Sequence, residues 1–159
     1  MKNLLLTIIF VLLTISTTNA QFFNQADVEI YKNDIAKQAK SLVKEHLDLT
    51  ADQAGIFWPL YDKYEVKYSV VLNEELKVLE DYLMNYYMLS DENAEELMNK
   101  SIKLKNKKLN LQKEYIETMS KELPVKLVGK FFQIHNRIDL MISQQRSEKI
   151  PLVRDQDKN

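Results

Sequence analysis

The chain has 159 residues, a formal net charge of −1 and no cysteine. A nearly neutral charge argues against a general nucleic-acid-binding protein, and the lack of cysteine excludes both a disulfide framework and a thiol nucleophile. Only two glycines and three prolines occur. Because Leu, Lys, Glu, Asn and Met dominate and the apolar residues recur with a helical period, we expect an all-α fold.

The N-terminus has the pattern of a secretory signal peptide. Lys2 supplies a positive charge, and a twelve-residue run from Leu4 to Ile15 is apolar except for two threonines. Small residues follow, with Thr18 and Ala20 at the −3 and −1 positions of a cleavage site. The alternative is a membrane anchor, but the run is too short to span a bilayer. We therefore expect residues 1–20 to be a signal peptide that is cleaved after Ala20, and a periplasmic protein without stable membrane insertion.

Four helices are predicted in the mature chain, over residues 25–46, 51–88, 91–121 and 125–148. The connections between them are short, so neighbouring helices should run antiparallel, with the second and third forming a long central hairpin. We expect one helical domain over 21–150 and a polar tail over 151–159. The apolar stripe of the second helix has steps of three and four, close to a coiled-coil seam. It consists of Phe57, Tyr61, Tyr64, Tyr68, Leu72, Leu76, Leu79, Leu83 and Tyr86.

Charges differ between the two helices of this predicted hairpin. The second half of the 51–88 helix is acidic, whereas the 91–121 helix carries many lysines. An antiparallel arrangement would bring the two segments together and neutralise them. The alternative is that the lysines form a basic recognition surface.

The sequence Leu49-Thr50-Ala51-Asp52-Gln53 is typical of a helix start. Thr50 suits the N-cap position, and its hydroxyl can accept the backbone N–H of Gln53 three residues later. The Gln53 side chain can in turn accept the backbone N–H of Thr50. These reciprocal bonds make a capping box.

A weak internal repeat relates two segments of the chain. Residues 49–65 align with residues 123–139 at an offset of 74, which matches Leu49 with Leu123 and Gly55 with Gly129. One interpretation is a two-fold repeat, in which a glycine in each helix allows another backbone to approach closely. The alternative is a coincidence between two amphipathic helix starts.

An exported, cysteine-free helical chain with this box resembles the Spy/CpxP (LTxxQ-motif) family of periplasmic proteins. The first box of the family is intact here as Leu49, Thr50 and Gln53. In the second box Leu123 is retained, but Pro124 and Leu127 stand where the family has Thr and Gln. The resemblance implies a curved helical cradle that is often dimeric. It also implies either an ATP-independent chaperone for unfolding clients or a regulator of an envelope-stress sensor.

Aromatic residues are the candidates for client binding. They cluster at two matching places, as Phe57, Trp58, Tyr61 and Tyr64 in the second helix and Phe131 and Phe132 in the fourth. The alternative is that they fill the core between helices. His46 and His135 are more typical of helix interfaces than of metal ligands.

The chain has no Gly-rich phosphate loop and no catalytic motif, so we expect a protein without cofactor or enzymatic activity. The leading hypothesis is an ATP-independent periplasmic chaperone whose partners are unfolded or envelope proteins, with a homodimer allowed. The alternative is a regulatory adaptor that docks on an envelope-stress sensor or anti-sigma protein.

Overall fold

The computed structural model describes residues 37–147 and 150–153, all of which belong to one unit, Asp34–Asn159. These residues form helices joined by short connections, with no strand among them, which confirms the all-α fold. A helix covers residues 37–46 and is followed by α3 (Ala51–Asn85), the short 3-10 helix η1 (Tyr86–Met88), α4 (Asp91–Glu122) and α5 (Val125–Ser147). The signal peptide expected over 1–20 and the start of the first helix lie outside the described residues.

Each long helix begins where its sequence can satisfy the free backbone N–H groups. At α3 the Gln53 N–H donates to Thr50 Oγ1 at 3.3 Å and the Thr50 N–H donates to Gln53 Oε1 at 3.1 Å, which confirms the predicted capping box. Ser90 caps α4 by accepting the Asn93 N–H at 3.2 Å. At α5 the Pro124 carbonyl accepts the N–H of Val128 at 3.2 Å, so this helix begins directly after a proline.

Three ion pairs on the surface of the α3–α4 hairpin show how its two helices are aligned. They join Lys67 to Glu114 at 2.6 Å, Glu74 to Lys107 at 2.6 Å and Asp81 to Lys100 at 3.9 Å. From one pair to the next the residue number rises by seven on α3 and falls by seven on α4. The two helices are therefore antiparallel with coiled-coil spacing. Because the pairs are about half exposed, they define the register more than they add stability.

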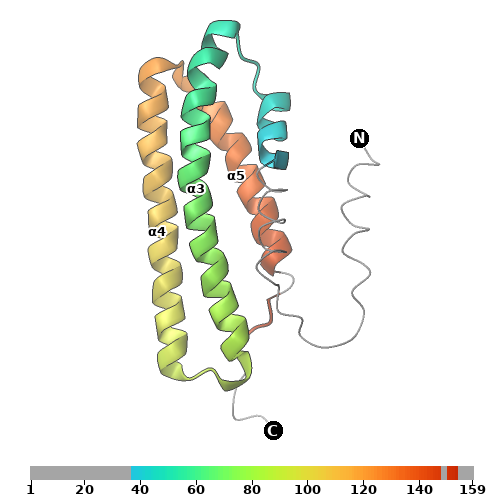
Figure 1. Cartoon of the computed structure of the whole chain (residues 1–159), viewed down its shortest axis with the longest axis vertical. Helices are drawn as coiled ribbons and strands as arrows, with labels where there is room; N and C mark the ends of the chain where they lie inside the picture. The colour runs from blue at the N-terminus through green and yellow to red at the C-terminus, as the bar shows by residue number, and fades with distance from the viewer. Residues whose placement is uncertain (1–36, 148–149, 154–159) are drawn as a thin grey trace, which may run out of the picture. The chain divides into compact units, whose positions relative to one another are not determined.

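The core lies in one half of the hairpin. Figure 1 shows α3 and α4 side by side, with α5 and the 37–46 helix beside the N-terminal part of α3. The 37–46 helix, α3, α4 and α5 all contribute to this core. The largest fully buried side chains of the core are Val43, Phe57, Tyr61, Tyr64, Met119 and Phe131. On α3 the last buried residue is Leu72, and on α4 the first is Leu104. None of residues 73–103 is buried, so the far half of the hairpin is a two-helix arm with no core of its own.

Two expectations about individual positions are wrong. Gly55 and Gly129 do not mark close backbone approaches, because a Cβ atom added at either would meet nothing within 4 Å. The predicted apolar seam of the second helix is buried only up to Leu72, and Leu83 is exposed because no third helix covers the arm. None of the described helices is both long enough and apolar enough to cross a membrane.

Candidate functional site

Five of the six aromatic residues expected to bind clients are core residues. Phe57, Tyr61, Tyr64, Phe131 and Phe132 are at most 6% exposed. Aromatic rings of α3 and α5 face each other, with Phe57 and Phe131 edge to face at 5.2 Å and Tyr64 and Phe132 at 5.7 Å. The prediction that these five side chains form a client-binding face is wrong, because they close the contact between the two helices.

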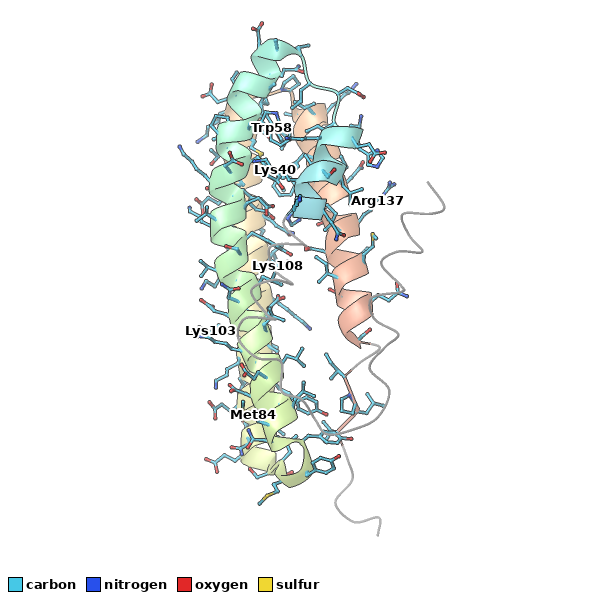
Figure 2. All side chains as sticks on the ribbon, turned by 45° about the vertical axis from the view of Figure 1, so that its right-hand side comes forward. Lys40, Trp58, Met84, Lys103, Lys108 and Arg137 are labelled. Atoms are coloured by element: carbon cyan, nitrogen blue, oxygen red, sulfur yellow. The ribbon has the colours of Figure 1, made fainter. Side chains whose placement is uncertain are left out.

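Trp58 is the sixth candidate, and it is half-buried. The Nζ atoms of Lys40 and Lys44 lie 5.6 Å and 5.5 Å from the centroid of its ring. Lys40 also pairs with Asp62 at 2.6 Å. Figure 2 shows Lys40 and Trp58 together between α3 and the 37–46 helix. The two lysines of this helix contact the Trp58 ring through cation–π interactions, so Trp58 joins helices rather than offering a free ring.

The leucines of the box and its degenerate copy are also structural. Leu49 packs against the core from just before α3, and Leu123 is buried where α4 gives way to α5. Leu123 N–H donates to the carbonyl of Met119 at 2.9 Å. The motif residues thus set helix ends and anchor them in the core.

A polar cluster, with His135 buried and its charged neighbours partly buried, joins α3, α4 and α5 next to the aromatic core. One carboxylate oxygen of Asp139, Oδ2, forms an ion pair with Lys108 Nζ at 2.9 Å. The other, Oδ1, accepts a hydrogen bond from the Tyr68 hydroxyl. His135 lies between two carboxylates, with Nδ1 3.7 Å from Asp139 Oδ2 and Nε2 4.0 Å from Glu65 Oε1. Figure 2 shows Lys108 between the α3–α4 pair and α5. The cluster therefore links three helices through charge.

Burial changes the titration of this cluster. It raises the pKa of Glu65 to about 7, and the negative charge of Asp139 adds to the rise while Lys40 opposes it. Burial lowers the pKa of His135 to about 4, Asp139 acts in the opposite direction, and the positive charge of Lys108 lowers the pKa further. The imidazole is therefore neutral at pH 7, and its Nδ1 has no hydrogen-bond partner. Burial also raises the pKa of Tyr68, so its hydroxyl stays protonated and donates to Asp139.

The cluster is enclosed by the helices. The side chains of His135, Asp139, Lys108 and Glu65 are 4%, 14%, 18% and 19% exposed. Such groups can store a proton and link helices, but they present little surface to a substrate. Sequence reasoning missed this cluster, although one signal was available. His135 and Asp139 are spaced i, i+4 on the side of α5 that also carries Phe131 and Phe132.

A cleft of about 570 Å³ lies elsewhere, between the 37–46 helix and α5. Its lining mixes charge and apolar surface and includes Leu42, Glu45, His46, Asp48, Lys130, Gln133, Ile134, Arg137, Ile138 and Met141. Across it Lys130 pairs with Asp48 at 3.1 Å. His46 is exposed at this cleft, whereas His135 is buried at a helix interface. Within residues 37–147 and 150–153, no group of three or more His, Asp or Glu side chains is arranged to hold a metal ion.

The end of the arm carries exposed apolar side chains, and only one of them, Leu83, belonged to the predicted seam. We define the hairpin-end surface as Leu83, Met84, Tyr87, Met88 and Met98. Met84 is labelled near the end of the hairpin in Figure 2, and Tyr87 and Met88 are 79% and 84% exposed. Met98 lies level with Leu83, because the Asp81–Lys100 pair is two residues away from both. The available signal was the Met- and Tyr-rich stretch at residues 82–88.

Comparison with known proteins finds no matching family model, no similar curated protein and no similar solved structure. The geometry of the chain therefore carries the functional argument.

Proposed function

We propose that the protein is an exported, ATP-independent chaperone that binds unfolding proteins through its hairpin-end surface. The observation that carries this proposal is the exposure of three methionines, a leucine and a tyrosine at the end of an arm that has no core of its own. Exposed apolar surface of this kind is typical of interaction sites. Methionine adapts to different partners because its side chain is unbranched and polarisable.

The resemblance to the Spy/CpxP family and the N-terminal signal pattern support the same proposal. A periplasmic chaperone works without ATP, so it needs neither a nucleotide site nor a catalytic one. Because five of the six aromatic candidates are buried, the proposed client surface lies at the end of the hairpin and not in its core half.

The experiment measures aggregation of several unrelated unfolding proteins at an equimolar ratio and without ATP. The double substitution Met84→Ser and Met88→Ser should weaken suppression. It should leave the melting temperature nearly unchanged, because both side chains are exposed and no residue of the arm is buried. The matched control is Leu140→Ser, which removes a similarly exposed apolar side chain from α5. Equal loss of suppression in the control, or no suppression of any client, would contradict the proposal.

The second candidate function is a regulatory adaptor, and the charged cleft between the 37–46 helix and α5 favours it. A single partner segment could fill a cleft of about 570 Å³ with both acidic and basic residues on its rim. Pull-down from a periplasmic extract separates the two functions. Many captured clients favour the chaperone, whereas one captured partner that is lost in Lys130→Glu but retained in Met84→Ser favours the adaptor.

A further inference from the structure

Residues 150–153, which come after α5 in the chain, lie against the last turn of α3 and the start of η1. The Tyr82 hydroxyl donates to the Pro151 carbonyl at 2.7 Å, and the Tyr86 hydroxyl donates to the Leu152 carbonyl at 3.2 Å. The two tyrosines are one helical turn apart, and their rings contact each other edge to face at 5.8 Å. Figure 1 shows residues 150–153 near the lower part of α3.

Both hydrogen bonds are made with the backbone of this segment and not with its side chains. The acceptors are main-chain carbonyls, while the side chains of Leu152 and Val153 point into solvent at 89% and 63% exposure. Residues 151–153 have no regular secondary structure, and Pro151 cannot donate a backbone hydrogen bond. Any non-helical polypeptide can offer two such carbonyls.

We propose that Tyr82 and Tyr86 form a binding site for non-helical polypeptide backbone, which residues 150–153 occupy in the free protein. The inference rests on the proposed function, because it names the site at which clients are held. Each tyrosine is followed in the chain by a residue of the hairpin-end surface, Leu83 and Tyr87, so a client that is held by its backbone at the tyrosines can extend toward that surface.

The attached segment then acts as a competitor for clients. Two neutral hydrogen bonds are together worth roughly tenfold in affinity, which is too weak to close the site permanently. A tethered segment nevertheless competes at an effective concentration of roughly millimolar. A client must bring further contacts with the hairpin-end surface to displace it, so the segment favours clients that expose apolar side chains.

The test compares the full chain with a chain that ends at Ser147. Ile142 is the last residue of the described core, so the truncation removes none of the described core. Thermal unfolding followed by circular dichroism checks that the truncated chain is folded. The probe is a fluorescent peptide with the sequence of residues 148–159, used beside a peptide of the same composition in scrambled order that keeps a proline. Both peptides should bind the truncated chain with similar affinity, and both should bind the full chain more weakly.

Removal of the two hydroxyls identifies the site. In the truncated chain, Tyr82→Phe with Tyr86→Phe should weaken binding of both peptides roughly tenfold, because both donors are lost. The matched control is Tyr115→Phe, which removes a phenol hydroxyl from the core half of the hairpin and should leave peptide binding unchanged. Binding of the natural peptide alone would overturn the proposal, because the site would then read side chains. Unchanged binding in the double variant would overturn it as well.

The same variants separate this inference from the proposed function. Affinity for a permanently unfolded protein should rise severalfold on truncation and fall again when the two hydroxyls are removed. If clients bind but neither change affects them, the tyrosine site is wrong and the chaperone proposal stands. If both peptides bind as described and no unfolded protein does, the site is supported and the chaperone proposal fails.

Discussion

Glu65 and His135 should give the folded protein two opposing dependences on pH. Burial raises the pKa of Glu65 from 4.5 to about 7, so its contribution to stability is fully present below pH 4.5 and is lost as pH rises to about 7. Burial lowers the pKa of His135 from 6.5 to about 4, so its contribution is present above pH 6.5 and is lost as pH falls to about 4. Between pH 4.5 and 6.5 the two contributions change in opposite directions.

The magnitude follows from the proton linkage of each group. One group that binds a proton in only one of the two states changes the free energy of unfolding by about 1.4 kcal/mol per pH unit. Over two pH units each group can therefore contribute roughly 2 to 3 kcal/mol, and the two largely cancel in the natural protein. Both side chains are less than a fifth exposed, so solvent screening reduces these values only modestly.

Single substitutions should reveal the two slopes separately. Relative to the natural protein, Glu65→Gln should become more stable as pH rises from 4.5 to 7, because the penalty of ionising a buried carboxyl is removed. His135→Gln should become relatively more stable as pH falls from 6.5 to 4, because no buried imidazole has to be protonated. Urea unfolding at half-unit pH steps measures the free energy of unfolding of each variant and of the natural protein. In the difference between the two, the contributions of all other titrating groups cancel.

The control for these two variants is the removal of an exposed carboxylate. Glu114→Gln removes a carboxylate that is about half exposed, and it reports the effect of deleting one surface charge from the hairpin. Slopes of the same sign in Glu65→Gln and His135→Gln would refute the reasoning. Flat differences in both variants would show that the cluster is open to water rather than buried.

Three further predictions concern stability. Thr50→Ala should cost about 1 kcal/mol of unfolding free energy because it removes the cap of α3, while Thr50→Asp should be nearly neutral; equal losses in denaturant unfolding would mean that Thr50 acts through another contact. Phe131→Ala should cost about 3 to 5 kcal/mol in the same assay, because the ring is fully buried among aromatic neighbours; a loss below about 1 kcal/mol would contradict its placement in the core. Reversal of Lys107 to Glu should cost less than about 1 kcal/mol, and adding Glu74→Lys should restore it; no recovery in the double variant would contradict the register of the hairpin.

Most of the fold could be predicted from local sequence signals. Each helix start, at Thr50, Ser90 or Pro124, is determined by residues of its own first turn. These positions can therefore be predicted from the sequence. The neutralisation of acidic α3 by lysines of α4 also follows, since a short connection leaves the two helices only an antiparallel arrangement.

The site could not be predicted in the same way, because exposure depends on which helices are present at each level of the hairpin. Phe57 and Leu83 lie on the same predicted stripe, yet Phe57 is buried under α5 and Leu83 is exposed. Periodicity identifies the side of a helix that is apolar, and only the length and direction of α5 decide how much of that side is covered. The buried cluster was missed for a related reason, because Glu65 and Lys108 meet Asp139 only when three helices come together.

Under the proposed function, the division of the hairpin separates the residues that stabilise the fold from those that bind clients. Residues 73–103 contribute no buried side chain, so substitutions there leave the packing of the core intact. The ion pair between Glu74 and Lys107, at the border of the two halves, keeps the arm in the register that the core imposes. Because the arm has no core of its own, packing does not determine which side chains it carries at exposed positions such as those of its methionines. The sequence at its end is therefore little constrained by packing, which is what the proposed binding role requires, while the buried aromatic residues near Phe131 maintain the fold.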